Sequence, residues 1–278
     1  MKIEGVLDVD LNTITIKQQI DYQNTSKNHL KELYFNDWTS SYSSPTTPLA
    51  NRFVEEFNNA LLDVKPKDRG FTEINTIKNS IGATLDYKYL EHNPDIFKVI
   101  LENELVPNSS ISLYFEYTLQ IQNDQFTGYG VTKNGDFNLK HWYFSPAVYE
   151  NLEWKLYSNK NIQDYYTPRS NIDLSIEVPE SYDVVSELSL ESTQVSQQKN
   201  TYHFTGLQRT DSRLYISKIP FLKFNVHNLN IITDKNQKDI NSLEQLDIFT
   251  KVVGFLDSKL AAYPQENLLI TRTDLNKY

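Results

Sequence analysis

Residues 13–22, TITIKQQIDY, decide the fold class, because β-branched residues alternate with polar ones along the stretch. Such alternation is typical of a half-buried β-strand, in which successive side chains point to opposite faces of a sheet. Residues 3–9 have the same character, and Asn12 lies between the two segments. The start of the chain is therefore predicted to form a β-hairpin.

Strand-like segments continue along the whole chain after this hairpin. They cover residues 30–35, 73–78, 84–89, 97–102, 111–121, 152–157, 172–178, 184–190, 202–207, 213–219 and 222–232. Pro, Asn, Asp and Gly separate these segments, and the 18 Tyr and 14 Phe of the chain favour pleated surfaces. Many short strands with turn signals between them predict a mainly β protein built as a β-sandwich.

Two segments depart from the β pattern. Residues 48–62 carry an apolar side chain at every fourth position, which predicts a short inserted helix. Residues 239–262 carry an apolar helical face, and a strand-like segment follows at residues 268–271. We therefore predict a β-sandwich domain over residues 1–235. Residues 236–278 are predicted to begin an α/β domain, and they are too few to bury a core of their own.

The charge and hydropathy of the chain exclude several kinds of partner. Lys and Arg number 27 against 36 Asp and Glu, so the formal net charge is −9. This charge repels phosphate backbones, and no basic cluster is present, so we expect neither nucleic acid nor a membrane surface as a partner. No apolar run approaches the roughly 20 residues of a membrane span. Neither a signal peptide nor a transmembrane segment is recognised, and the sequence assigns no compartment.

No complete catalytic or metal-binding pattern is found in the 278 residues. The chain has no cysteine, which excludes disulfides, thiol catalysis and zinc–thiolate sites. The five histidines are far apart in sequence, and none belongs to an HExxH motif: His29, His92, His141, His203 and His227. No serine lies in a GxSxG elbow, and GYG at residues 128–130 is a turn rather than a phosphate loop. We expect no cofactor in this chain.

Residues 136–157, DFNLKHWYFSPAVYENLEWKLY, are unusually dense in aromatic side chains. One interpretation is a core strand and corner, because aromatic rings bury large areas. The other is one wall of a binding cleft, in which His141 and the neighbouring rings line a pocket. The sequence alone leaves both interpretations open.

Several segments resemble the N-terminal domain of the aminopeptidase N family of zinc metallopeptidases. They occur in the family's order and span nearly the whole chain: residues 30–57, 68–74 (DRGFTEI), 141–150 (HWYFSPAVYE) and 172–185. The closest likeness is to the Bacteroidetes-type branch. The resemblance implies a saddle-like β-sandwich packed against a thermolysin-like catalytic domain, of which residues 239–271 would be the first helix and strand. On this resemblance the chain stops before the HExxH motif, and zinc belongs to the intact parent.

The resemblance also implies a set of residues facing the substrate cleft. The family's N-terminal domain supplies a Gln or Glu that binds the free α-amine of the substrate, and a Thr-Gln pair precedes the Trp of a WYPKPAVYD-like segment. Lys140 and His141 stand at the positions of that pair. A neutral imidazole can accept a hydrogen bond from an ammonium group, whereas Lys140 would repel it. The cleft residues implied are His141, Trp142 and Tyr143, with Asn138 and Lys140 as neighbours.

The leading functional interpretation is a non-catalytic domain that walls the peptide cleft and supports a downstream catalytic domain. The parent would hydrolyse N-terminal residues from peptides, so the partners are that catalytic domain and a peptide substrate. The alternative is an interaction or scaffold module of a peptidase-like protein without zinc chemistry. A carbohydrate-binding β-sandwich is a third interpretation, which rests on the aromatic residues alone.

Overall fold

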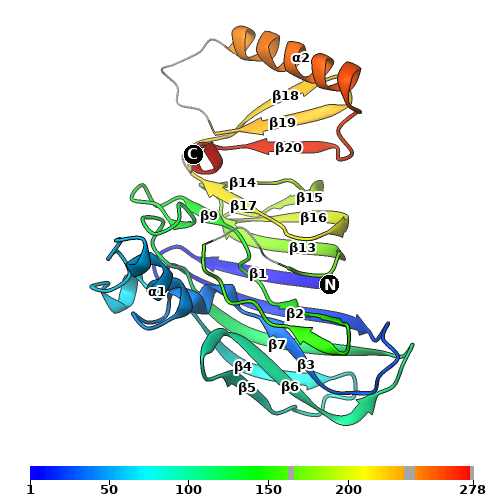
Figure 1. Ribbon diagram of the computed structural model, residues 1–278. Helices are drawn as coiled ribbons and strands as arrows, with labels where there is room; N and C mark the ends of the chain where they lie inside the picture. The colour runs from blue at the N-terminus through cyan, green and yellow to red at the C-terminus, as the bar shows by residue number, and fades with distance from the viewer. Residues whose placement is uncertain (162–165, 235–241, 276–278) are drawn as a thin grey trace.

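The computed structural model describes residues 1–161, 166–234 and 242–275, and it is mainly β, as predicted (Figure 1). The largest sheet contains β1 (Lys2–Asp8), β2 (Thr13–Gln23), β4 (Phe71–Asn79), β7 (Ser110–Gln120), β13 (Ser170–Pro179), β15 (Ser189–Val195) and β16 (Lys199–Arg209). Within the described residues the order of these seven strands is β15-β16-β13-β1-β2-β7-β4. The β1-β2 hairpin predicted from the alternation is confirmed, with an antiparallel pairing along all of β1.

The first strand lies in the interior of this sheet rather than at its edge. On the side away from β2, β1 pairs in parallel with β13. The amide of Asp173 donates a hydrogen bond to the carbonyl of Met1 at 3.0 Å, and the ammonium group of Met1 donates to the carbonyl of Asn171 at 2.7 Å. The centre of the sheet is therefore completed only by residues from the second half of the chain.

Two smaller sheets complete the sandwich. One contains β3 (Leu30–Asn36), β5 (Tyr87–Leu90), β6 (Asn93–Leu105) and β10 (Ser145–Pro146), in the order β10-β3-β6-β5. The other contains β8 (Gly130–Val131), β9 (Phe137–Leu139), β14 (Asp183–Ser186) and β17 (Leu214–Ser217), in the order β14-β17-β9-β8. Buried side chains from all three sheets form one continuous cluster, which is the core of the β-sandwich. The strand predicted at residues 152–157 is present but shorter, as β12 (Glu153–Lys155), which forms a hairpin with β11 (Val148–Glu150).

Phe144 and a buried glutamine join the layers of the core. The Phe144 ring stacks on Tyr117 with centroids 4.0 Å apart and meets Phe97 edge to face at 4.8 Å. Gln18, only 2% exposed, donates from Nε2 to the Phe144 carbonyl at 2.7 Å and accepts from the Phe144 amide at 3.2 Å. Tyr117 also donates its hydroxyl to Gln18 Oε1 at 2.7 Å. A polar side chain on the inward face of β2 thus completes the hydrogen bonding of a segment that crosses the core.

The helix predicted for residues 48–62 is shorter in the structure, where α1 spans Pro48–Glu55. Its start follows the expected chemistry, because Thr47 caps it by accepting from the Ala50 amide and proline occupies the first turn. Phe57 ends the apolar face: its φ is +59° and its side chain is 97% exposed. The apolar side chains at every fourth position, which predicted a longer helix, therefore extend beyond the end of α1 into a turn. Two short 3₁₀ helices, η1 (Trp38–Tyr42) and η2 (Pro66–Asp68), flank this region.

The C-terminal residues form a small α/β unit at one end of the sandwich (Figure 1). Its sheet has the order β18-β19-β20, with β18 (Leu222–Val226), β19 (Leu229–Thr233) and β20 (Asn267–Ile270), and α3 (Arg272–Leu275) follows. The helix predicted from residue 239 is present as α2 (Ser242–Lys259), and residues 239–241 lie outside the described residues. The boundary predicted at 235/236 falls between β19 and β20, so sheet pairing groups residues 222–233 with the C-terminal helix.

One face of α2 is packed and the other is open. Leu246, Phe249 and Val253 pack against the β18-β20 sheet. On the outer side, the apolar side chains of Ile248 and Phe255 are 49% and 61% exposed. No described helix combines the length and the apolar character needed to cross a membrane.

Replacing Gln18 by leucine tests how much the core depends on its polar bridge. Gln18→Leu is expected to lower the free energy of unfolding by about 2–3 kcal/mol. The Phe144 carbonyl and the Tyr117 hydroxyl lose their buried partner, and the Phe144 amide keeps only the Tyr117 hydroxyl at 3.3 Å. Urea unfolding measures the change. Gln19→Leu, on the opposite face of β2, is the matched control and should change stability by less than about 0.5 kcal/mol. Equal effects of the two substitutions would show that the bridge is unimportant.

Candidate functional site

A backbone kink after β9 brings Lys140 and His141 to the same cavity. Consecutive residues of a strand normally face opposite sides of a sheet. His141 has a φ of +51°, a left-handed conformation that is uncommon outside glycine. As a result, both side chains line one small cavity. Strained backbone of this kind is often found at binding sites.

The small cavity has a volume of about 50 Å³ and lies between η1, the turn at residues 127–129 and the end of β9. Its walls are formed by Trp38, Thr39, Tyr42, Gln122, Thr127, Tyr129, Lys140, His141, Asn159 and Asn161. Lys140 and His141 are the basic residues of this wall, and none of the lining residues is acidic. The cavity therefore combines aromatic rings, neutral polar groups and positive charge.

Asp211 lies behind His141 and holds its ring. Asp211 Oδ2 is 3.1 Å from His141 Nδ1, and both side chains are largely buried. Burial raises the pKa of Asp211, but the positive charges of His141 and Lys140 outweigh this effect and leave the pKa below its ordinary value. Trp38 meets the His141 ring edge to face, with centroids 4.7 Å apart. The imidazole is thus held in one orientation at the cavity wall.

Lys140 has a different environment from His141. Its Nζ lies 5.3 Å from the centre of the Tyr129 ring, a cation–π contact. Among the described residues no carboxylate forms an ion pair with Lys140. The lysine is half-buried, so its charge is only partly screened by water.

The turn that supplies Tyr129 requires a glycine after it. Gly130 has a φ of +132°, and a Cβ atom at this position would lie 2.1 Å from the carbonyl oxygen of Gln122. The same carbonyl accepts a hydrogen bond from the Val131 amide at 2.8 Å. Only glycine allows these backbones to approach so closely, and this crossing places Gln122 and Tyr129 in the cavity wall.

Buried carboxylates anchor the other wall of the small cavity. Asp95 accepts hydrogen bonds from the Ser158 hydroxyl and, at 2.7 Å, from the Asn159 amide. Asn159 Nδ2 donates in turn to Ser41 of η1 at 2.9 Å. Burial raises the pKa of Asp95 to about 6, although these hydrogen bonds lower it. Burial likewise raises the pKa of Asp37, which precedes η1.

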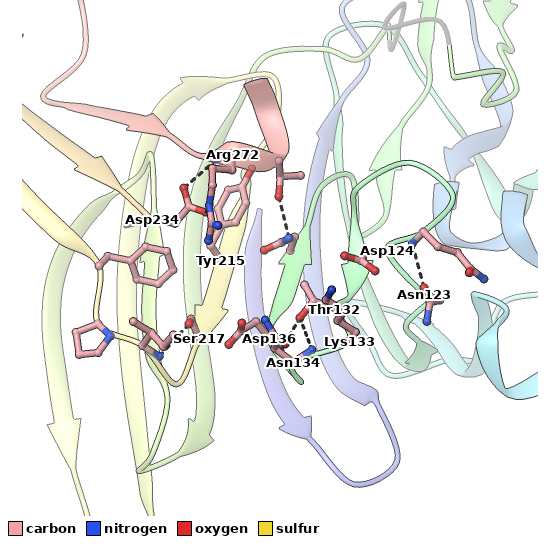
Figure 2. Close-up of a pocket in the computed structure, with 16 residues that line it drawn as sticks. Asn123, Asp124, Thr132, Lys133, Asn134, Asp136, Tyr215, Ser217, Asp234 and Arg272 are labelled. Carbon is pink, nitrogen blue, oxygen red and sulfur yellow. Dashed lines mark hydrogen bonds and ion pairs between the residues drawn. The ribbon is translucent and has the colours of Figure 1, made fainter. Parts of the chain in front are cut away.

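Asn138 faces a second and larger cavity of about 610 Å³. Its Nδ2 donates to Thr273 Oγ1 of α3 at 2.9 Å, so this cavity lies where the sandwich meets the C-terminal unit. Figure 2 shows Lys133 and Asp136 on one side of this cavity and the Asp234–Arg272 ion pair, 3.1 Å long, on the other. Basic and acidic groups are mixed here, so no single ligand charge is favoured.

Trp142 and Tyr143 do not face either cavity. They are only 2% and 4% exposed and belong to the main core cluster, and Trp142 Nε1 donates to the Ser212 carbonyl at 3.1 Å. For these two rings the structure corrects the cleft assignment in favour of core packing, because the kink at His141 turns the following residues inward. Asn138, Lys140 and His141 remain at cavity walls.

The described residues offer no metal site. No group of three or more His, Asp or Glu side chains in this part of the chain is placed to hold a metal ion. His29, His203 and His227 are each within 3.3 Å of a single carboxylate at the surface. A zinc ion has no ligand set here, and no zinc chemistry is assigned to these residues.

Gln18, Asp95 and Asp211 were missed by the sequence reasoning. Gln18 could have been found, because it follows Ile14 and Ile16 at the inward positions of an alternating strand and is polar. Asp95 lies 64 residues from its partner Asn159, and Asp211 lies 70 residues from its partner His141, so no local pattern connects either pair. Their roles depend on contacts that only the fold creates.

No protein-family model and no curated protein matches the chain. Solved structures do match its fold. A mutant of the M1 zinc metallopeptidase from Deinococcus radiodurans has a TM-score of 0.57 at 10% identity, over 97% of this chain and 55% of that chain. A two-domain M1 zinc metallopeptidase mutant bound to L-arginine has a TM-score of 0.55 at 10% identity, with the same coverage. The Deinococcus mutant bound to a Tyr-Ser-Ala substrate has a TM-score of 0.55 at 9% identity, again over 97% and 55% of the two chains. The chain therefore shares the fold of about half the length of these metallopeptidases.

Asp95 gives a testable pH dependence. Its folded pKa of about 6 exceeds the ordinary value of 3.8, so between these pH values the folded state holds a proton that the unfolded state releases. Stability from this group is therefore present at low pH and is lost as pH rises to 6, by about 3 kcal/mol in total. Asp95→Asn removes this loss, so the variant should gain stability relative to the natural protein between pH 4 and 7.

Urea unfolding at several pH values measures this difference. Asp86→Asn is the control, because Asp86 is exposed and its substitution should give an offset that stays nearly constant with pH. If the free energy of unfolding of both variants changes with pH in the same way as that of the natural protein, Asp95 is not held neutral by burial.

Proposed function

We propose that the chain is the N-terminal β-sandwich domain of an M1-type zinc aminopeptidase, close to the Bacteroidetes-type branch. In this role it walls one side of the peptide cleft and supports the catalytic domain. The observation that carries the proposal is the extent of the fold match, which covers 97% of this chain but 55% of a two-domain metallopeptidase. The likeness of residues 141–150 to the family supports the same assignment.

The C-terminal unit has an exposed apolar surface that fits a large partner domain. Between α2 and strands β19 and β20 lies a groove of about 340 Å³, lined almost entirely by apolar side chains such as Val252, Leu256 and Leu260. Contiguous exposed apolar surface marks an interaction site. We assign this surface to the rest of the catalytic domain, of which residues 222–275 would be the first part. Zinc and the hydrolysis of N-terminal residues from peptides would belong to that domain.

The small cavity supports a cleft role for the segment after β9. Lys140 and His141 line this cavity. They stand at the positions where the family has the Thr-Gln pair that precedes the WYPKPAVYD-like segment. This substitution is also the observation that favours the alternative function, an interaction or scaffold module without zinc chemistry, because a lysine opposes an ammonium group.

The coding sequence beyond Tyr278 separates these two functions. For the peptidase we expect an HExxH motif followed by a Glu roughly 20 residues later, and zinc-dependent release of N-terminal residues by the protein that includes it. Residues 1–278 alone should be inactive. A downstream domain of the same fold without the zinc motif would instead establish the scaffold function.

His141 tests the cleft role in the peptidase. His141→Ala should raise KM for peptide substrates about fivefold with little change in kcat, as expected for a lost binding contact of about 1 kcal/mol. His203→Ala is the matched control, because His203 also pairs with an aspartate, Asp173 at 2.9 Å, but lies outside both cavities. An unchanged KM for His141→Ala would refute the cleft role.

A further inference from the structure

The wall of the small cavity is basic. It contains Lys140 and His141 and no acidic side chain. Asp211 lies 3.1 Å from His141, whereas no ion pair of Lys140 is found in the described parts of the chain.

The groups around Lys140 offset its positive charge only in part. Its Nζ approaches the Tyr129 ring at 5.3 Å, and such contacts contribute only about 0.5–1 kcal/mol at partly exposed sites. Asp211 is close enough for Lys140 to lower its pKa, but this carboxylate is already paired with His141. A half-buried cation with low-dielectric walls attracts anions more strongly than an exposed one does.

The dimensions of the cavity limit the group that it can accept. A volume of about 50 Å³ is several times the roughly 10–15 Å³ that one water needs, so a group of a few heavy atoms fits and a whole residue does not. Thr127 and Asn161 add polar groups to the wall, and the Trp38 ring, held against His141, closes one side. A planar carboxylate matches this combination of size, charge and hydrogen-bonding groups.

We propose that the small cavity is a carboxylate-binding subsite, in which Lys140 supplies the charge while His141 and Trp38 form rigid walls. The consequence for the parent rests on the proposed function: it would prefer peptides that place a carboxylate here. The carboxylate is either an acidic side chain or a peptide C-terminus. A free ammonium group is disfavoured at this subsite.

Binding to the 278-residue chain tests the subsite directly. Three acetylated ligands, all without a free amine, are titrated by calorimetry at low salt. N-acetylglutamate α-amide has only a side-chain carboxylate, N-acetylalanine has only a terminal carboxylate, and N-acetylglutamine α-amide has neither. At least one carboxylate ligand should bind about tenfold more tightly than the neutral amide, a difference of about 1.4 kcal/mol. The stronger of the two identifies the source of the carboxylate.

Substitutions of lysine assign this preference to Lys140. Lys140→Gln should abolish it, whereas Lys140→Arg should retain it and exclude misfolding as the cause. Lys133→Gln is the matched control, because Lys133 lies on the neighbouring turn and lines the larger cavity. Equal binding of all three ligands, absence of binding, or a preference that survives Lys140→Gln would overturn the proposal.

The outcome is independent of the peptidase assignment. A chain that binds carboxylates through Lys140 while its downstream sequence lacks HExxH would keep the subsite and reject the peptidase. A zinc-dependent parent whose isolated domain shows no carboxylate preference would do the opposite.

Discussion

The hydrogen bonds between the Gln18 amide and the backbone of Phe144 connect the core to the candidate site. Gln18 lies on β2, and Phe144 lies three residues after His141. By pairing with both the amide and the carbonyl of Phe144, the glutamine side chain substitutes for a neighbouring strand. The segment can therefore cross the core with its rings buried, and its preceding residues are held at the small cavity. The same hydrogen bonds thus constrain both the packing of the core and the geometry of the small cavity.

Charge is distributed around this segment in an ordered way. Asp211 lies 3.1 Å from His141, and Asp95 accepts hydrogen bonds from the opposite wall. These acids lie behind the cavity and leave its lining free of negative charge. Because a buried carboxylate is stable only with partners, each of them also fixes the backbone that carries those partners. The wall that contains Lys140 and His141 is therefore held in place from behind by buried acidic residues.

Local pattern predicted the β class, the first hairpin and the existence of both main helices, because side-chain periodicity is set by the strand or helix itself. It failed where conformation depends on distant contacts. Spacing extended α1 through Phe57, which the structure turns into solvent with a positive φ. The kink at His141 directs Trp142 into the core, and nothing in the neighbouring sequence indicates this kink. The resemblance implied that Asn138, Lys140 and His141 face a substrate cleft, and this stays a prediction. In the structure these residues line two cavities, and their interaction partners come from elsewhere in the fold.

The parallel pairing of β1 with β13 has a consequence for synthesis on the ribosome. Met1 and Asn171 are 170 residues apart, so at roughly 5–20 residues per second the partner of β1 emerges roughly 10–30 s after it. Until then the hairpin exposes one unpaired edge with its apolar face, which invites association between nascent chains. Expression of this protein should therefore depend strongly on chaperones that bind early β-hairpins, and slower folding is inherent in so non-local a sheet.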